Sequence, residues 1–350
     1  MDTRASLVAA VEAFIAHPER DAFEALALRI HRYQVAHDAV IRALLDGPVE
    51  TVDAIPAVPV ALFKDTPLGT VDANTPHVAF HTSGTTTGNS GVHRMHDTRL
   101  YDAGCFRHAQ GWLPNTRRTL ALMPDSPTSS LAHMVRGFAP YTGAVQFAVH
   151  QTDGASTLDL ELLAERGTPT FVCATAFALD AWLASDPAPL TAGSAIMVTG
   201  GFKGRAHALS ADDLLDAAGR VAPVVVEYGM TELSSQLWAH AGQPYTPPPW
   251  LRVQAVDPAT GTPLPADSRG QLRFVDLCNV DSTVHVETLD EGRVHPDGRV
   301  TLLGRLPDTP ARGCSLTVED LLGSSDLTGV ASRPSAIDDT RTGDASENLE

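Results

Sequence analysis

Residues 4–46 carry apolar side chains at the spacing of amphipathic helices. A proline at position 18 interrupts the pattern, because proline disrupts a helix interior. The turn residues Asp46-Gly47-Pro48 then end it. The first apolar stripe consists of Val8, Val11, Phe14 and Ile15, and the second begins with Phe23, Leu26 and Ile30. The spacing predicts an N-terminal helical cap over residues 1–50.

Between residues 78 and 228, short apolar runs alternate with stretches of helical periodicity. The runs have the length and composition of buried strands. They lie at 119–123, 143–149, 169–175, 195–199 and 221–226, and the helical stretches at 99–112, 129–134, 159–165, 177–185 and 212–220. Such alternation is typical of a parallel sheet covered by helices. We therefore expect an α/β core over residues 51–243.

After a proline-rich segment at 244–250, the apolar period changes towards two. Strands are expected at 251–256, 270–276 and 299–303, with turn residues between them. This pattern predicts a second, β-rich subdomain over residues 250–322. Residues 323–350 are rich in Ser, Asp and Thr, and they have the composition of a disordered acidic tail.

Composition restricts the classes of partner and compartment. The chain has 350 residues, of which 43% are hydrophobic and 19% charged, so a large buried core is expected. Its net charge of −17 disfavours nucleic acid and anionic membranes. Four scattered cysteines without a C-x-x-C pair argue against a zinc site and indicate a reducing cytoplasm. No apolar run approaches the roughly 18 residues of a membrane span, and no signal peptide is evident.

A loop rich in Ser, Thr and Gly follows the apolar run 78–80. Glycines let a ligand approach the backbone, successive N–H groups bind anions, and hydroxyls donate to phosphate oxygens. The candidate phosphate-binding residues are Thr82, Ser83, Gly84, Thr85, Thr86 and Gly88. The pattern is not the common G-x-x-x-x-G-K-[S/T] loop, because Asn89 stands where a lysine might be expected. From composition alone, a flexible surface loop is an equal alternative.

The segment Thr82-Ser83-Gly84-Thr85-Thr86, followed by Gly88 and Gly91, resembles the phosphate loop of the adenylate-forming enzymes. That superfamily includes acyl-CoA synthetases, peptide-synthetase adenylation domains and firefly luciferase. Its usual form is T-S-G-T-T-G-x-P-K-G. This chain has an extra Thr87 and lacks the lysine before Gly91, for which His93 or Arg94 could substitute. The resemblance implies ATP as co-substrate and the layered α/β large domain of that superfamily.

A second motif, Tyr228-Gly229-Met230-Thr231-Glu232, resembles the Y-G-x-T-E motif of the same superfamily. Carried over residue by residue, Tyr228 would stack on the adenine, Thr231 would contact the α-phosphate and Glu232 would help to hold a Mg²⁺ ion, with Gly229 as a further nucleotide-binding residue of the motif. A carboxylate and a hydroxyl beside phosphates suit a hard cation with oxygen ligands. The alternative is a tight strand-to-helix turn without chemistry.

Four further residues are candidates through weaker similarities. Gly201 belongs to a glycine-rich strand end, His133 occupies a position where the superfamily often closes over the adenylate, and Asp290 belongs to a T-x-D-x-G segment whose carboxylate would bind the ribose. Arg305 lies in the Gly-Arg pair that would mark the hinge to a small C-terminal domain, which we expect to be truncated or missing. A core or capping role for His133 and an acidic turn at Asp290 remain open.

The Pro-Val-x-x-Phe-Lys element ending at Lys64 resembles one subfamily, the acyl-protein synthetases of bacterial bioluminescence. In that subfamily the acyl group passes from AMP to a cysteine near the C-terminus and then to a partner reductase. Cys314, in an Arg-Gly-Cys-Ser-Leu segment, is the matching residue. A buried structural cysteine is the alternative. Lys64 itself is interpreted as a surface lysine.

The sequence therefore predicts an enzyme that converts ATP and a carboxylic acid into an acyl-adenylate and pyrophosphate. The acyl group would move to a thiol or an amine, with the chain's own cysteine, a carrier protein or a reductase as possible acceptors. A catalytically degenerate nucleotide-binding or scaffold protein on the same fold is the main alternative. A kinase or hydrolase is a third, although the chain has no Walker lysine.

Overall fold

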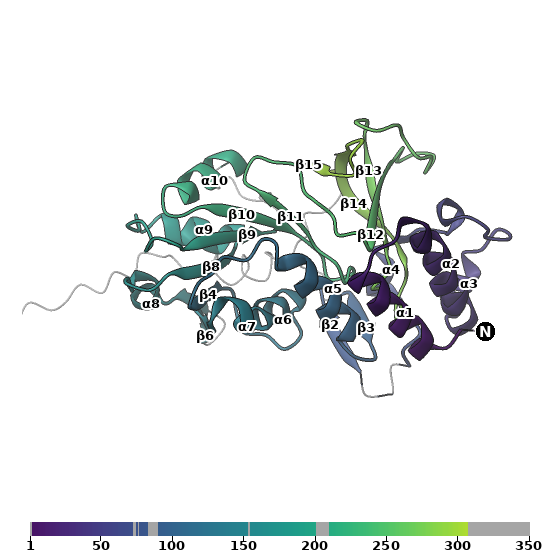
Figure 1. Ribbon diagram of the computed structural model, residues 1–350, viewed down its shortest axis with the longest axis horizontal. Coiled ribbons are helices and arrows are strands. Elements are labelled where there is room, and N and C mark those ends of the chain that lie inside the picture. Colours follow the sequence, from purple (N-terminus) through teal and green to yellow (C-terminus); the bar gives the residue numbers. More distant parts are fainter. Residues whose placement is uncertain are drawn as a thin grey trace, which may run out of the picture.

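The computed structural model describes residues 2–72, 75, 77–82, 90–152, 155–200 and 210–306. Two sheets dominate this part of the chain, and a group of N-terminal helices lies beside the second sheet (Figure 1). The mixed α/β architecture predicted from the sequence is confirmed. Among the described residues, no helix combines the length and apolar character needed to cross a membrane.

The N-terminal helices follow the predicted pattern, divided into three pieces. They are α1 (Arg4–Ala16), α2 (Arg20–His37) and α3 (Ala39–Ala43). Thr3 and Ser6 form a capping box at the start of α1, and the Asp38 carboxylate accepts from the first N–H groups of α3. The apolar faces of α1 and α2 bury Leu7, Val11 and Ile30 completely, and they pack against residues that lead into and out of the second sheet.

The first sheet has the strand order β11-β10-β9-β8-β4-β5. Its strands are β4 (Arg118–Leu122), β5 (Ala144–Phe147), β8 (Thr170–Thr175), β9 (Ala195–Thr199), β10 (Val224–Tyr228) and β11 (Leu237–His240). All neighbours pair in parallel except β10 and β11, which are antiparallel. The parallel sheet is therefore confirmed, and β11 is an edge strand that sequence analysis missed.

Helices cover both faces of this sheet, so alternate residues of each strand enter different cores. Ile196 and Val198 of β9 pack with α8 (Leu160–Ala164), α9 (Ala176–Leu183) and α10 (Ala211–Gly219). Ala195 and Met197 pack on the opposite face with α5 (Arg99–Ala109) and α6 (Ser130–Gly137). The short α7 (Ala139–Thr142) follows α6 on that side (Figure 1).

The second sheet is built around the long strand β14. Its strands are β1 (Val58–Pro59), β12 (Leu251–Val256), β13 (Arg269–Asp276), β14 (His285–Val294) and β15 (Val300–Arg305). Strand β13 lies along one edge of β14, whereas β1 and β15 share its other edge. The period of two correctly predicted β12, β13 and β15. Strand β14 was not predicted.

Two hairpins and two short helical turns complete the described fold. The hairpins pair β2 (Val78–His81) with β3 (Val92–Met95), and β6 (Val149–Thr152) with β7 (Ala155–Leu158). The turns are a 3₁₀ helix at Val52–Ala54 and α4 (Leu62–Asp65). The end of the Pro-Val-x-x-Phe-Lys element therefore lies in α4.

A buried clamp of hydrogen bonds holds the segment after β10 against the end of β13. Asp276 is 0% exposed, and its carboxylate accepts from the backbone N–H groups of Ser234, Ser235 and Cys278. Nearby, the Asn279 amide accepts from Ser234 N and donates to the carbonyl of Glu232. Because these groups are buried away from water, each depends on its protein partner for a hydrogen bond. The clamp therefore fixes residues 232–235 relative to the second sheet.

Replacing Asp276 by Ala should destabilise the protein by at least about 3 kcal/mol. The Ser235 N–H, the Ser235 hydroxyl and the Cys278 N–H would lose their acceptor, whereas Ser234 N keeps the Asn279 amide oxygen. Each unsatisfied buried group costs about 1–3 kcal/mol. Denaturant unfolding of Asp276→Ala measures the loss. Asp257→Ala is the matched control, because that exposed carboxylate also accepts from two backbone N–H groups, which water can satisfy instead. Equal losses in the two variants would contradict the clamp.

Candidate nucleotide and acid site

The β2–β3 hairpin closes the base of the predicted phosphate loop. Thr82 N donates to the carbonyl of Gly91 over 2.8 Å, and Gly91 N donates to Thr82 Oγ1 over 2.7 Å. Ser90 Oγ adds a hydrogen bond to the carbonyl of Thr82. The loop therefore connects two antiparallel strands. Its predicted residues Ser83, Gly84, Thr85, Thr86 and Gly88 lie outside the described residues.

Thr231 of the second motif lies directly against this hairpin. Its hydroxyl makes a weak contact of 3.5 Å with the carbonyl of His81, and its own carbonyl is 2.7 Å from His93 Nδ1. A carbonyl only accepts, so Nδ1 carries the proton and Nε2 accepts from the Ser282 hydroxyl. Burial lowers the pKa of His93 to about 4. His93 is therefore neutral at pH 7 and does not supply the charge of the missing loop lysine.

Lys64 brings a positive charge to the base of the loop. The side chain is half-buried, and its Cγ is 3.3 Å from the position that a Cβ atom would take on Gly91. The charge of its ammonium group helps to lower the pKa of Glu232. A half-buried stem is compatible with the interpretation of Lys64 as a surface lysine, which stays a prediction. Its burial comes from tertiary packing of α4, which the local sequence does not reveal.

Glu232 is a buried carboxyl group between charges of both signs. It is 8% exposed, and burial raises its pKa to about 7. The negative charge of Asp290 acts in the same direction, whereas Lys64 and Arg305 act against it. Within the described ranges, no three His, Cys, Asp or Glu side chains form a metal-binding cluster. The residues present still suit Mg²⁺, which is commonly held by one or two carboxylates together with phosphate oxygens.

Tyr228, Asp290 and Arg305 form a hydrogen-bonded group across the two sheets. The Tyr228 hydroxyl donates to Asp290 Oδ2 over 2.7 Å, and Arg305 Nε donates to Oδ1 over 3.2 Å. The Tyr228 ring stacks on Phe274, with ring centroids 5.8 Å apart. Asp290 lies within β14, opposite Arg305 of β15, so the alternative of an acidic turn is wrong. Burial, together with Asp290, raises the pKa of Tyr228 well above its usual value.

His133 lies on α6 and is tied to α5. Its Nε2 is 2.7 Å from Asp102 Oδ1, and Thr98 Oγ1 donates to the other oxygen of that carboxylate. The ring centroid is 5.3 Å from that of Phe80 in β2, so His133 is close to the hairpin that carries the loop. A role for His133 over the adenylate stays a prediction. The predicted Gly201 and Cys314 lie outside the described residues.

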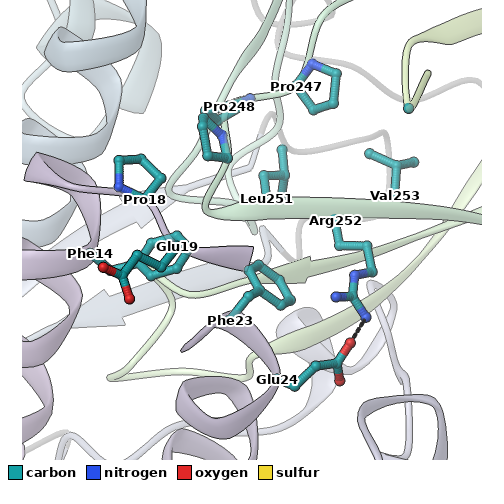
Figure 2. Close-up of a pocket in the computed structure, with 12 residues that line it drawn as sticks. Phe14, Pro18, Glu19, Phe23, Glu24, Pro247, Pro248, Leu251, Arg252 and Val253 are labelled. Carbon is teal, nitrogen blue, oxygen red and sulfur yellow. Dashed lines mark ion pairs between the residues drawn. The ribbon is translucent and has the colours of Figure 1, made fainter. Parts of the chain in front are cut away.

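A pocket of about 720 Å³ opens elsewhere, between the N-terminal helices and the proline-rich segment. Figure 2 shows Phe14 and Phe23 on the helical side, with Pro247 and Pro248 across from them. Arg252 forms an ion pair with Glu24 and also lies over the Phe23 ring. Among the residues that the structure describes, no candidate site residue lines this pocket.

The sequence model of the AMP-binding enzyme family matches residues 3–275. This match covers most of the chain, and the protein therefore belongs to the AMP-binding enzyme family. The resemblance to the adenylate-forming superfamily found in the two motifs is thereby confirmed at the level of the family. A comparison with curated proteins found no match.

Several solved structures are similar to this chain at low identity. ATP-bound MatB from Rhodopseudomonas palustris is 17% identical with a TM-score of 0.47, over 65% of this chain and 47% of that one. O-succinylbenzoate coenzyme A synthetase (MenE) from Bacillus subtilis, in complex with AMP, is 17% identical with a TM-score of 0.47, over 66% and 49%. A luciferase-like enzyme from the mealworm Zophobas morio is 15% identical with a TM-score of 0.49, over 69% and 60%. The chain thus spans about half the length of the first two proteins.

Lys64→Met should weaken the binding of inorganic tripolyphosphate by at least about tenfold, because a charged hydrogen bond is worth about 1.5–3 kcal/mol. Isothermal titration calorimetry at low salt measures the affinity. Lys64→Arg keeps the charge and should retain most of the binding. Equal affinities for wild type and Lys64→Met would place the phosphate chain away from Lys64.

Proposed function

We propose that the protein activates a carboxylic acid with ATP, forming an acyl-adenylate and releasing pyrophosphate. One observation carries the proposal beyond family membership. Segments that are remote in sequence come together: Lys64 and Thr231 lie against the Thr82–Gly91 closure, and the charges of Lys64, Asp290 and Arg305 all act on Glu232. Together they offer two cations, hydroxyls and two carboxylates, which are the groups needed around a Mg²⁺-bound nucleotide.

The chemistry needs positioning and charge neutralisation rather than proton transfer. An oxygen of the acid's carboxylate attacks the α-phosphorus of ATP, the bond from that phosphorus to the bridging oxygen breaks, and pyrophosphate leaves. The acid is already ionised at pH 7, so no general base is required. Lys64 neutralises charge on the departing pyrophosphate, and Thr231 donates to the α-phosphate. A Mg²⁺ ion held by Glu232 would add charge neutralisation when bound.

The remaining groups would orient the nucleoside. Tyr228, held flat by Phe274, offers a face for the adenine ring. Asp290 accepts hydrogen bonds and is the residue proposed to bind the ribose hydroxyls, while Arg305 keeps that carboxylate in place. Such an arrangement holds the α-phosphorus in line with the attacking acid, which accounts for a large part of the rate in this kind of reaction.

The acyl acceptor is proposed to be a thiol, in the manner of the acyl-protein synthetases. Cys314 is the candidate within the chain, and it lies outside the described residues. Cys105, Cys173 and Cys278 are buried, and burial raises the pKa of all three thiols well above the usual value. They are therefore poor nucleophiles. A carrier protein, a reductase partner or an amine would serve as an external acceptor.

The absence of a lysine before Gly91 supports a second candidate function, a nucleotide-binding protein that no longer catalyses the reaction. Exchange of labelled pyrophosphate into ATP, tested with a panel of carboxylic acids, separates the two. The proposed enzyme exchanges label only when its acid is present. A degenerate binder exchanges none, and a kinase or hydrolase would release ADP or phosphate instead.

Glu232→Gln should lower the acid-dependent exchange at least about tenfold and raise the Mg²⁺ concentration needed for half-maximal activity, because a metal contact is lost. The variant should fold, since the amide has the shape of the carboxylic acid. Glu291→Gln is the matched control: Glu291 is also 8% exposed but pairs with Arg269. Normal exchange by Glu232→Gln at limiting Mg²⁺ would refute the metal assignment.

Asp290→Ala should raise the KM for ATP about ten- to a hundredfold while the KM for the acid stays nearly constant, because hydrogen bonds to a charged acceptor are lost. Assays with 2′,3′-dideoxy-ATP identify the lost contact: this nucleotide should be a poor substrate for wild type, and Asp290→Ala should not discriminate against it further. Tyr228→Phe removes only the hydrogen bond from the Tyr228 hydroxyl to Asp290 and keeps the one from Arg305. If that variant reproduces the whole effect, Asp290 acts only by positioning Tyr228.

A further inference from the structure

Polar side chains lie in a row at the carboxyl ends of three neighbouring strands of the first sheet. Thr175 of β8 lies beside Thr199 of β9, and Thr199 lies beside Glu227 of β10. All three are at the carboxyl ends of parallel strands, where open α/β sheets bind their ligands. Thr175 caps α9 with its hydroxyl. Thr199 and Glu227 have no such role in the fold, and the proposed adenylation steps do not use them.

The Glu227 side chain lies on the face of the sheet that α5 and α6 cover. It is opposite Trp238 of β11 and two residues from Val225, and both of these side chains belong to the core on that face. Its charge also raises the pKa of Cys105 and Cys173, which lie in the same core. The carboxyl group is therefore next to the motif that begins at Tyr228, but on the inner side of the sheet.

Burial of the Glu227 carboxylate is energetically unfavourable. It is 4% exposed, and burial raises its pKa to about 7. Thr199 Oγ1 donates a hydrogen bond to Oε2. The other oxygen, Oε1, lies 2.5 Å from the position that a Cβ atom would take on Gly229. A Cβ atom at position 229 would force this oxygen to move, so Gly229 leaves the carboxyl group its present position.

The buried side chain of Gln236 is a second, independent observation that points to a ligand here. It is 4% exposed, and its Oε1 atom is buried without a hydrogen-bond partner. Its Cγ lies 3.2 Å from the same Cβ position on Gly229, so the Gln236 and Glu227 side chains converge there. A buried acceptor without a donor costs about 1–3 kcal/mol. The unpaired Gln236 Oε1 and the neighbouring Glu227 carboxyl group are both acceptors, so a single ligand with several donors could bind to both.

We propose that Glu227 and Gln236, supported by Thr199, bind an ammonium group on the carboxylic acid, so that the substrate is an amino acid rather than an unsubstituted fatty acid. This inference rests on the proposed function and names its substrate class. An ammonium group carries only donors, and the two side chains offer a carboxylate and an amide oxygen as acceptors. Its positive charge also compensates the buried carboxylate, which a hydroxyl group would not do.

The position of the pair fits this role. Glu227 and Thr231 are four residues apart in one motif, and Thr231 is the residue proposed to contact the α-phosphate. An acid whose carboxylate reaches the α-phosphorus can therefore extend its amino group inward, towards the face covered by α5 and α6. A long alkyl chain would instead place methylene groups against Glu227 and Gln236, which leaves Gln236 Oε1 without a donor and the buried charge of Glu227 without compensation.

Pyrophosphate exchange with matched pairs of acids tests the proposal on the full chain. Each pair consists of an amino acid and the same acid with hydrogen or hydroxyl in place of the amino group, covering α-, β- and γ-amino, aliphatic and aromatic acids. Saturated fatty acids complete the panel. The best substrate should be an amino acid, and its kcat/KM should exceed that of each partner by at least about tenfold. A fatty acid, a hydroxy acid or a deamino acid as best substrate would overturn the proposal.

Glu227→Gln separates substrate binding from support of the fold. It should lower kcat/KM for the amino acid at least about tenfold, leave the deamino partner within about threefold, and leave the KM for ATP unchanged. Gln236→Met should reduce the same preference by less. Equal losses for both members of a pair would show a structural role only and overturn the proposal.

Calorimetric titration distinguishes failure of this inference from failure of the proposed function. If no acid supports exchange, adenylation itself is refuted. Titrating the same acid pairs into the protein with AMP then still tests the subsite: tighter binding of the amino member, lost in Glu227→Gln, would uphold it. Equal binding of both members, or no binding, would overturn it.

Discussion

The hydrogen bonds between the Asp276–Asn279 turn and residues 232–235 are the constraint on which the site depends. Tyr228 is the last residue of a strand of the first sheet, and Thr231 and Glu232 follow that strand, whereas Asp290 and Arg305 belong to the second sheet. Asp276 binds the backbone of Ser234 and Ser235, and Asn279 binds the carbonyl of Glu232 itself. Since the clamp is buried and uses backbone N–H groups, it fixes the path of the chain and not merely one side chain. The two sheets can then present their groups to one ligand.

Burial strengthens the hydrogen bonds of the clamp. It also makes the ionised forms of the buried carboxyl groups Glu227 and Glu232 depend on nearby positive charge. The pKa values of Glu227 and Glu232 are raised to about 7 by burial, compared with ordinary values near 4.5. Between those values the folded chain binds more protons than the unfolded chain, so the contribution of these groups to stability falls as pH rises towards 7. A Mg²⁺ ion beside Glu232 and an ammonium group beside Glu227 would each compensate a charge that is costly in the free protein. The proposed ligands therefore match the electrostatics of the fold.

Much of the fold could be predicted from the sequence because buried strands and amphipathic helices leave a local periodic signal. The runs that became β8 and β9 and the stripes of α1 and α2 are examples. Strand β14 was missed because Gly292, an irregular pairing near it, and the acidic residues Asp290 and Glu291 imitate a turn. The motifs around Thr82 and Tyr228 could be predicted as parts of one nucleotide site because the residues within each are contiguous, and the structure places Thr231 against the hairpin that carries Thr82. The environments of Lys64, His93 and Gln236 could not be predicted from the sequence, because segments that are distant along the chain bury each of them.

Transfer of oxygen-18 from the acid to AMP tests the central claim most directly. The full chain is incubated with ATP, Mg²⁺ and its carboxylic acid substrate, labelled with oxygen-18 in both carboxylate oxygens. Hydroxylamine then intercepts the acyl group by attack at its carbonyl carbon. If the carboxylate attacks the α-phosphorus, the attacking oxygen stays on the phosphate. Mass spectrometry should then find one labelled oxygen in each AMP released. Unlabelled AMP, or ADP carrying no label beside labelled phosphate, would contradict an acyl-adenylate intermediate.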